Sequence, residues 1–196
     1  MKTLPIYTYG FDVLRKKTKR LTKIDDKIIE LAGNMFYTMH KANGVGLAAP
    51  QVGIDLAMTV IDVSHLEGEE DTKPLTLINP KILDSHDSII FEEGCLSIPH
   101  IRAEVERPET IFVEYQDLDL NPQTVELEGY VARVAQHEID HLNGVLFIDH
   151  LSKEVRDDFR EQLRLIKEGG IQTNYLLAEL PKKNKKSSKN NYLDRI

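Results

Sequence analysis

VARVAQHEIDHL, residues 131–142, predicts a helix that carries two histidines and a carboxylate at closely spaced positions. The Asn-Gly pair at 143–144 follows it, and both residue types readily end a helix in the left-handed conformation. His137 and His141 are four residues apart, so their imidazoles lie one turn apart on one face and can bind one metal ion. Glu138 between them can reach a water molecule beside that ion. The alternative is that both histidines are surface residues on a charged helix. A third metal ligand elsewhere in the sequence is needed to distinguish these two interpretations.

The segments before and after this helix predict an α+β fold. Apolar residues recur at helical spacing over residues 25–44, where Asp25 or Asp26 can cap the start of a helix and an Asn-Gly pair its end. Another helix is expected after Ser152, because apolar residues recur every three or four positions over 151–166. Short segments rich in β-branched residues and bounded by Gly, Pro, Asp or Asn predict strands at 56–63, 74–80, 88–93, 103–108 and 110–117. Their connections are too short for crossover helices, so we expect mostly antiparallel short strands packed around the central metal-binding helix, with an N-terminal and a C-terminal helix.

The length of 196 residues fits one catalytic domain, expected to span residues 1–170, with an extension over 171–196. The extension ends in PKKNKKSSKNNYLDRI, a lysine-rich segment with too few apolar residues to pack, which we expect to be disordered. The formal net charge of the whole chain is -7 although the tail is basic, so the residues before the tail are acidic. We therefore expect no binding to DNA. The basic tail could contact an anionic partner such as the ribosome.

The sequence also bears on where the protein works. No apolar run reaches the ~18 residues that a membrane span needs, and the N-terminal residues lack the pattern of a secretory signal. Cys95 is the only cysteine, so no disulfide can form within the chain. We therefore expect a protein of the reducing cytoplasm without a membrane partner.

A catalytic site with two histidine ligands needs a third protein ligand and one open position. Downstream, the metzincin protease pattern requires histidine where Phe147 stands, and His150 lies three residues too far along. Glu154 or Glu161 could complete a thermolysin-like site, but nothing in the sequence distinguishes either one. Upstream, Cys95 follows a predicted strand and a pair of glutamates, and a thiolate is a strong ligand for a borderline metal. A lone cysteine can also be a small buried hydrophobic residue, but the adjacent glycine and carboxylates favour a Cys-His-His metal site.

Residues 44–53, GVGLAAPQVG, contain a glycine-rich pattern that formally fits dinucleotide-binding folds. However, a predicted helix rather than a strand precedes it, and Pro50 prevents the uninterrupted helix that should follow. We interpret it as a loop whose backbone comes close to a ligand, with Gly46 at the approach and Gln51 presenting an uncharged donor. A tight turn between a helix and a strand is the alternative.

Together, three of these segments resemble the peptide deformylase family, whose patterns are G-φ-G-φ-A-A-P-Q, E-G-C-φ-S and Q-H-E-φ-D-H, where φ is apolar. This chain has GVGLAAPQ at 44–51, EGCLS at 93–97 and QHEIDH at 136–141, in the same order. The resemblance extends over roughly the first 165 residues and excludes the tail.

The resemblance implies an enzyme that removes the formyl group from N-formyl-methionyl nascent peptides and releases formate. It implies one divalent metal ion, usually Fe²⁺, with Zn²⁺, Ni²⁺ or Co²⁺ able to occupy the site. Glu138 would be the general acid/base, while the Gln51 side chain and the Leu96 N–H would stabilise the oxyanion. The implied metal ligands are Cys95, His137 and His141.

The family likeness also assigns supporting residues. Glu93 and Arg102 match a pair that braces the cysteine loop in the family. Val134 and Tyr130 are candidates, on helical spacing, for the pocket that binds the methionine side chain, although either could be a core residue. The expected substrate-binding residues are Gly46, Gln51, Leu96 and Val134.

Two other functions remain open at this point. One is a zinc endopeptidase of the H-E-x-x-H type, which would need a downstream ligand and an open cleft. The other is a non-catalytic, ribosome-associated module with a structural metal, for which the basic tail is the only indication. A closed four-ligand site would favour the latter, yet the sequence offers no fourth ligand of comparable quality.

Overall fold

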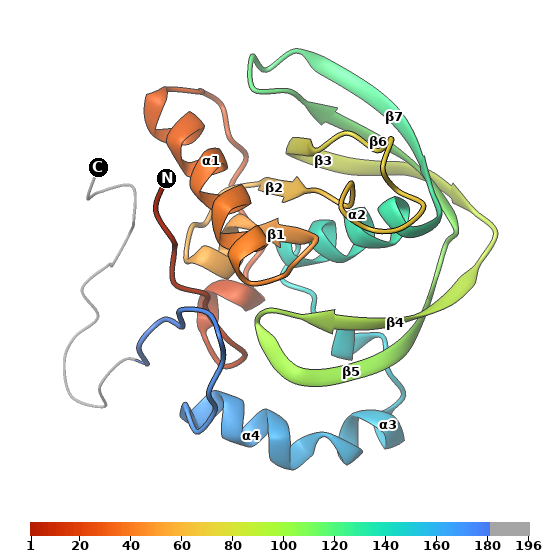
Figure 1. Cartoon of the computed structure of the whole chain (residues 1–196). Helices are drawn as coiled ribbons and strands as arrows, with labels where there is room; N and C mark the ends of the chain where they lie inside the picture. The colour runs from red at the N-terminus through yellow and green to blue at the C-terminus, as the bar shows by residue number, and fades with distance from the viewer. Residues whose placement is uncertain (181–196) are drawn as a thin grey trace.

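The structure of the protein is a computed structural model, in which residues 1–180 are described. Two antiparallel sheets organise it (Figure 1). Strands β4 (Ile89–Cys95) and β5 (Ile98–Arg107) form a two-stranded hairpin. The larger sheet has the order β1-β2-β3-β6-β7, with bounds Gly46–Ala48, Met58–Ile61, Leu75–His86, Thr110–Gln116 and Pro122–Glu128. The expected antiparallel α+β fold is confirmed, while β1 and β7 were not predicted as strands.

Helix α2 (Gly129–Leu142) lies between the larger sheet and the β4–β5 hairpin (Figure 1). Ala132, Ala135 and Ile139 on α2 pack in one apolar cluster with residues of the larger sheet. Most of the other α2 side chains are buried as well, including polar and charged ones. Because a buried polar group is costly unless it has a partner, the polar face of this helix has to be used for binding or for hydrogen bonds.

Helix α1 (Asp26–Lys41) forms and ends as its sequence predicts. The Asp25 carboxylate caps its start by accepting a hydrogen bond from the backbone N–H of Ile28 at 3.2 Å. Past its end, Asn43 adopts a left-handed conformation with φ 54°. The apolar stripe of α1 is buried in the core around β1 and β2, so the helix covers one flank of the larger sheet.

The C-terminal helix predicted after Ser152 is divided into α3 (Lys153–Asp158) and α4 (Arg160–Glu168). Ser152 caps α3 as expected, by accepting from the N–H of Val155 at 3.3 Å. The break lies at Phe159, whose ring packs into the same apolar cluster as Leu163 and Ile166. The apolar positions therefore face one side across the break, which is why the spacing alone predicted one helix.

After α4 the chain turns back and runs along the N-terminal segment. Gly169 has φ 75°, which L-residues rarely adopt, and permits this turn. Leu177 forms a parallel bridge with Ile6, so residues 171–180 lie against the body of the fold. The division into a catalytic domain over 1–170 and an extension stays a prediction, and the lysine-rich tail lies outside the described residues. Within residues 1–180 no helix is long and apolar enough to cross a membrane.

Candidate metal centre and active site

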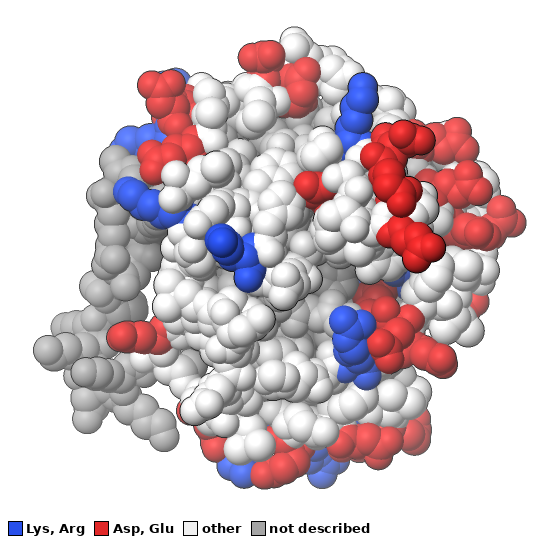
Figure 2. Space-filling model, in the orientation of Figure 1, with Lys and Arg blue, Asp and Glu red and all other residues white. Residues whose placement is uncertain are grey.

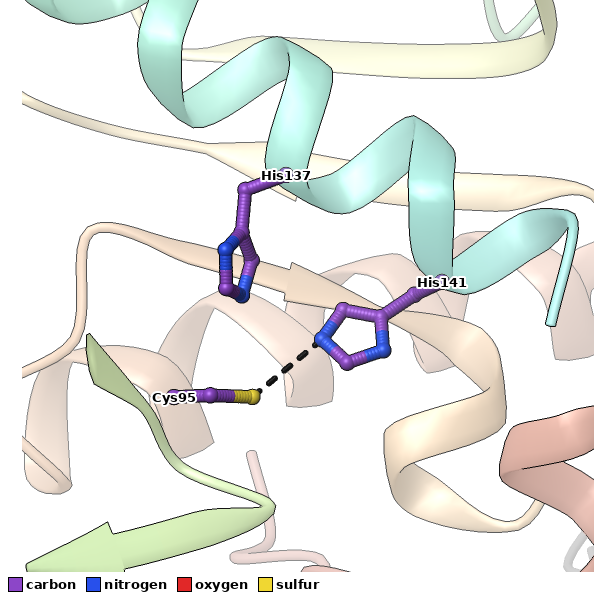
Figure 3. Close-up of side chains that lie close together, drawn as sticks. All are labelled: Cys95, His137 and His141. Carbon is purple, nitrogen blue, oxygen red and sulfur yellow. Dashed lines mark hydrogen bonds between the residues drawn. The ribbon is translucent and has the colours of Figure 1, made fainter. Parts of the chain in front are cut away.

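Cys95, His137 and His141 meet at one point between the hairpin and α2 (Figure 3). Cys95 is the last residue of β4, and the two histidines project from successive turns of α2. One ligand atom from each of the three lies within 4.8 Å of the others. The Sγ of Cys95 is 3.2 Å from Nε2 of His141. Three donor atoms this close together could hold one metal ion.

Glu93 orients one of the two imidazoles. Its Oε2 lies 2.9 Å from Nδ1 of His137, so Nδ1 carries the proton and Nε2 offers its lone pair to the metal position. Carboxylates in this position fix the ring and increase its basicity as a ligand. The donor set therefore fits a divalent ion of borderline softness.

Glu93 is held by two arginines, neither of which is the one predicted. Arg107 donates to both carboxylate oxygens of Glu93, at 2.6 and 3.1 Å, and Arg133 donates at 2.8 Å. The predicted Glu93–Arg102 pair is wrong, because Arg102 pairs with Glu92 at 3.1 Å on the surface. Neighbouring residues of a strand point to opposite faces, so Glu92 faces outward with Arg102 while Glu93 faces the core.

The charges around the site favour a cation. Burial opposes ionisation of Glu93, but hydrogen bonds from His137 and Arg107 hold the pKa of this carboxyl well below its ordinary value. Burial also opposes a proton on His137, yet its contacts with Cys95 and Glu93 raise its pKa. The negative groups that attract a proton to this ring also favour a divalent ion beside it. Burial lowers the pKa of His141 and favours the neutral imidazole that a metal needs.

Glu138 is the buried carboxylate closest in sequence to the ligands. Its Oε2 has no hydrogen-bond partner among residues 1–180, and burial raises its pKa to about 7. Gly46 lies directly against it, since a Cβ on Gly46 would come within 2.8 Å of both Cγ of Glu138 and Cγ1 of Val134. The glycine at this position thus lets β1 approach α2 closely enough to bring the 46–51 segment to the site.

Gln51 lies beside Cys95. The segment expected to be a loop consists of β1 and the 3₁₀ helix η2 (Ala49–Val52), which place this side chain. Oε1 of Gln51 accepts from the N–H of Ala48 at 2.7 Å, so its NH₂ group points to the site and lies 3.5 Å from Sγ of Cys95. The amide is therefore a fixed donor beside the metal position.

These groups line one pocket of about 620 Å³. The sequence-predicted residues that line it are Gly46, Gln51, Glu93, Cys95, Leu96, Arg102, Tyr130, Val134, His137 and Glu138. His141 is buried and is not among the residues that line the pocket. Figure 2 shows that acidic side chains gather on the right of this face and that its middle is mostly uncharged. The pocket lining itself mixes apolar and polar side chains.

Sequence reasoning missed three residues that support the site: Arg107, Arg133 and Tyr175. Arg133 stands one turn before His137 on α2, and that spacing was the one available signal. Arg107 is on β5 and Tyr175 is beyond α4, so only the folded pairing brings them to Glu93 and Leu96.

A cysteine and two histidines that could hold a metal ion at a pocket, with a buried carboxylate beside them, are the residue set that a metal-dependent hydrolase needs. Comparisons with known proteins specify the class further. The polypeptide deformylase family profile matches residues 3–157. A peptide deformylase of Chlorobium phaeovibrioides is 45% identical over 175 residues, which cover 89% of this chain and 92% of the relative.

Solved structures agree with the sequence comparison. A peptide deformylase from Legionella pneumophila has a TM-score of 0.78 at 38% identity, with coverage of 86% of this chain and 98% of that one. The enzyme from Thermotoga maritima has a TM-score of 0.72 at 45% identity, with coverage of 78% and 99%. This chain belongs to the peptide deformylase family. It is an enzyme that removes the N-formyl group from nascent peptides, and the endopeptidase and non-catalytic alternatives are not favoured.

Proposed function

We propose that Glu138 is the general acid/base of deformylation and that Cys95, His137 and His141 bind the metal. The single observation that supports this most is that Glu138, next to His137 in the sequence, is buried, lines the pocket and has one oxygen unpartnered among residues 1–180. A carboxylate that faces a pocket without a structural partner is available for proton transfer.

The proposed reaction is hydrolysis of a formyl amide. When bound, the divalent ion supplies Lewis-acid polarisation and favours the ionisation of water. Glu138 takes a proton from the water that attacks the formyl carbon, and later delivers that proton to the leaving amine. The Gln51 amide and the Leu96 N–H donate hydrogen bonds to the oxyanion as it develops. The products are formate and a peptide with a free N-terminal methionine.

Substrate binding is proposed to use the pocket walls. Gly46, Gln51, Leu96 and Val134 form the substrate-binding set. Val134 and Tyr130 lie in an apolar cluster next to the pocket and suit the methionine side chain. The backbone at Gly46 packs closely against the Glu138 side chain. The narrow space beside Glu138 favours a formyl group over larger acyl groups.

Replacement of Glu138 by Gln tests the mechanism. The variant should keep about one metal ion per chain, because the three ligands are untouched, and should lose about 10²–10⁴-fold in kcat. Glu104→Gln, the same change at an exposed position of β5, is the matched control. His137→Ala should instead remove metal and activity together. A metal-replete Glu138→Gln enzyme that turns over a formyl-methionyl peptide at the wild-type rate would refute the assignment.

The physiological ion is proposed to be Fe²⁺. A thiolate with two imidazoles suits a borderline metal, and Zn²⁺, Ni²⁺ or Co²⁺ could occupy the same donors. Metal analysis of protein purified without oxygen should find about one iron ion per chain, because the three proposed ligands form one site. A protein isolated fully active with zinc alone would contradict the choice of iron.

The cellular setting is also a proposal. We place the enzyme in the cytoplasm, where nascent chains carry the formyl group, and fractionation of cells would test this. The lysine-rich tail is proposed to make a weak, salt-sensitive contact with the ribosome. Co-sedimentation with ribosomes should be weaker for a chain that ends at Leu180 than for the full chain, and equal sedimentation would refute the contact.

A further inference from the structure

The segment after α4 returns to the active site and binds its backbone. The hydroxyl of Tyr175 donates to the carbonyl oxygen of Leu96 at 2.8 Å. Thr173, Asn174 and Tyr175 line the same pocket as the metal ligands. Every second residue over 171–177 is partly buried and the residues between them are exposed, so one side of this segment faces the body of the fold.

Tyr175 is held through both its backbone and its ring. Its carbonyl accepts from Oγ1 of Thr173 at 2.6 Å, and its ring packs, as Leu96 does, against the same apolar core. Burial raises the pKa of its hydroxyl, so the group stays protonated and remains a donor. The hydrogen bond to Leu96 is therefore a constant feature at neutral pH.

The same segment also pairs with the N-terminal part of the chain at Ile6. The N–H of Ile6 donates to the carbonyl of Leu176, and the N–H of Ala178 donates to the carbonyl of Ile6, each at 2.8 Å. Residues 7 and 9 in turn donate to the carbonyls of Gln51 and Ser97, also at 2.8 Å each. The backbones at both proposed oxyanion-binding residues thus connect to residues 175–178.

We propose that Tyr175 is a positioning residue, which fixes the peptide group between Leu96 and Ser97 and so restrains the backbone orientation of Leu96, whose N–H would stabilise the oxyanion. This inference rests on the proposed role of the Leu96 N–H. A donor for an oxyanion is effective only when its direction is set before the reaction, since reorientation during the reaction costs part of its benefit. Tyr175 fixes the carbonyl of Leu96, while residue 9 fixes the next carbonyl, at Ser97. The Leu96 backbone is therefore restrained on its C-terminal side by two hydrogen bonds from segments distant in sequence.

Tyr175→Phe removes the hydroxyl and keeps the packed ring. With formyl-methionyl-alanine as substrate, we expect kcat per bound metal to fall about 3- to 10-fold, which corresponds to one neutral hydrogen bond, with KM within about two-fold of wild type. Hydrogen exchange at the Leu96 amide should become faster. Tyr37→Phe on α1, outside the pocket, is the matched control and should change none of these values.

A purely structural role predicts a different result. The variant would then have a lower midpoint of thermal unfolding and fewer active molecules, but an unchanged kcat per bound metal. That result, or a kcat equal to that of Tyr37→Phe, would overturn the inference. The proposed mechanism is tested by a different variant, Glu138→Gln, and fails if that variant keeps the wild-type rate. Failure of the mechanism can therefore be distinguished from failure of the proposed role of Tyr175.

Discussion

Replacing Glu93 with Gln removes one negative charge from a buried group of ions. The side chains of Glu93, Arg107 and Arg133 are 4%, 5% and 3% exposed. With glutamine at 93, Asp140, which pairs with Arg107 at 2.7 Å, is the nearest remaining carboxylate partner in this group. Loss of one partner from a buried ion pair costs about 3–5 kcal/mol, because the other charge stays buried without compensation.

The metal site should weaken as well. The Glu93 carboxylate accepts from Nδ1 of His137, and loss of such a partner typically reduces metal affinity by about 10–100-fold. Urea unfolding of the metal-free protein would give the change in the free energy of unfolding. Competition with a chelator of known affinity would give the change in metal binding.

Glu92→Gln provides the matched control in the neighbouring position. Glu92 and its partner Arg102 are 60% and 66% exposed, and surface pairs contribute only about 0–1 kcal/mol. The two substitutions are chemically the same and differ only in the face of β4 that they alter. If both variants lost similar stability and similar metal affinity, the assignment of Glu93 as the buried anchor of the site would be refuted.

Two further predictions concern the backbone. Gly46→Ala should abolish most activity, because the added Cβ would contact Glu138 and come within 2.8 Å of Cγ1 of Val134. The control Gly33→Ala lies on α1, where an added Cβ would meet no atom within 4 Å. This control should stabilise the protein by up to about 1 kcal/mol. Activity assays with metal analysis separate loss of chemistry from loss of the ion. A chain that ends at Leu180 should turn over a short formyl-methionyl peptide within a few-fold of the full chain, because the tail supplies none of the proposed ligands or proton-transfer groups, and a large loss measured in the same assay would contradict this.

The features predicted correctly from the sequence are those set by short-range spacing. The i,i+4 arrangement of His137 and His141 fixes their common face regardless of the rest of the fold. The caps at Asp25 and Ser152 likewise depend on residues three positions away. Placing Cys95 with the histidines rested on its residue type and on its glycine and glutamate neighbours, with support from the family patterns, because no local rule connects residue 95 to α2.

The features missed depend on which strands pair and which face each residue takes. Glu93 and Arg107 are brought together by the β4–β5 hairpin, whereas the predicted partner Arg102 lies on its outer face. The strand β1 has three residues and contains a glycine and an alanine, so propensity gave no indication of it. Tyr175 reaches Leu96 only because the chain reverses after Gly169.

Pairing of Ile6 with Leu177 has a consequence for the protein's own synthesis. A ribosome releases residues in order, so Cys95, His137 and His141 are available before the segment that contains Tyr175 has been made. Contacts between such distant positions also form late, because closing a long loop is entropically costly. The nascent enzyme should therefore be able to hold a metal ion at the proposed ligands before the contacts of Tyr175 form. A chain interrupted shortly after α4 would keep the proposed metal ligands but lack the contacts that restrain the Leu96 backbone.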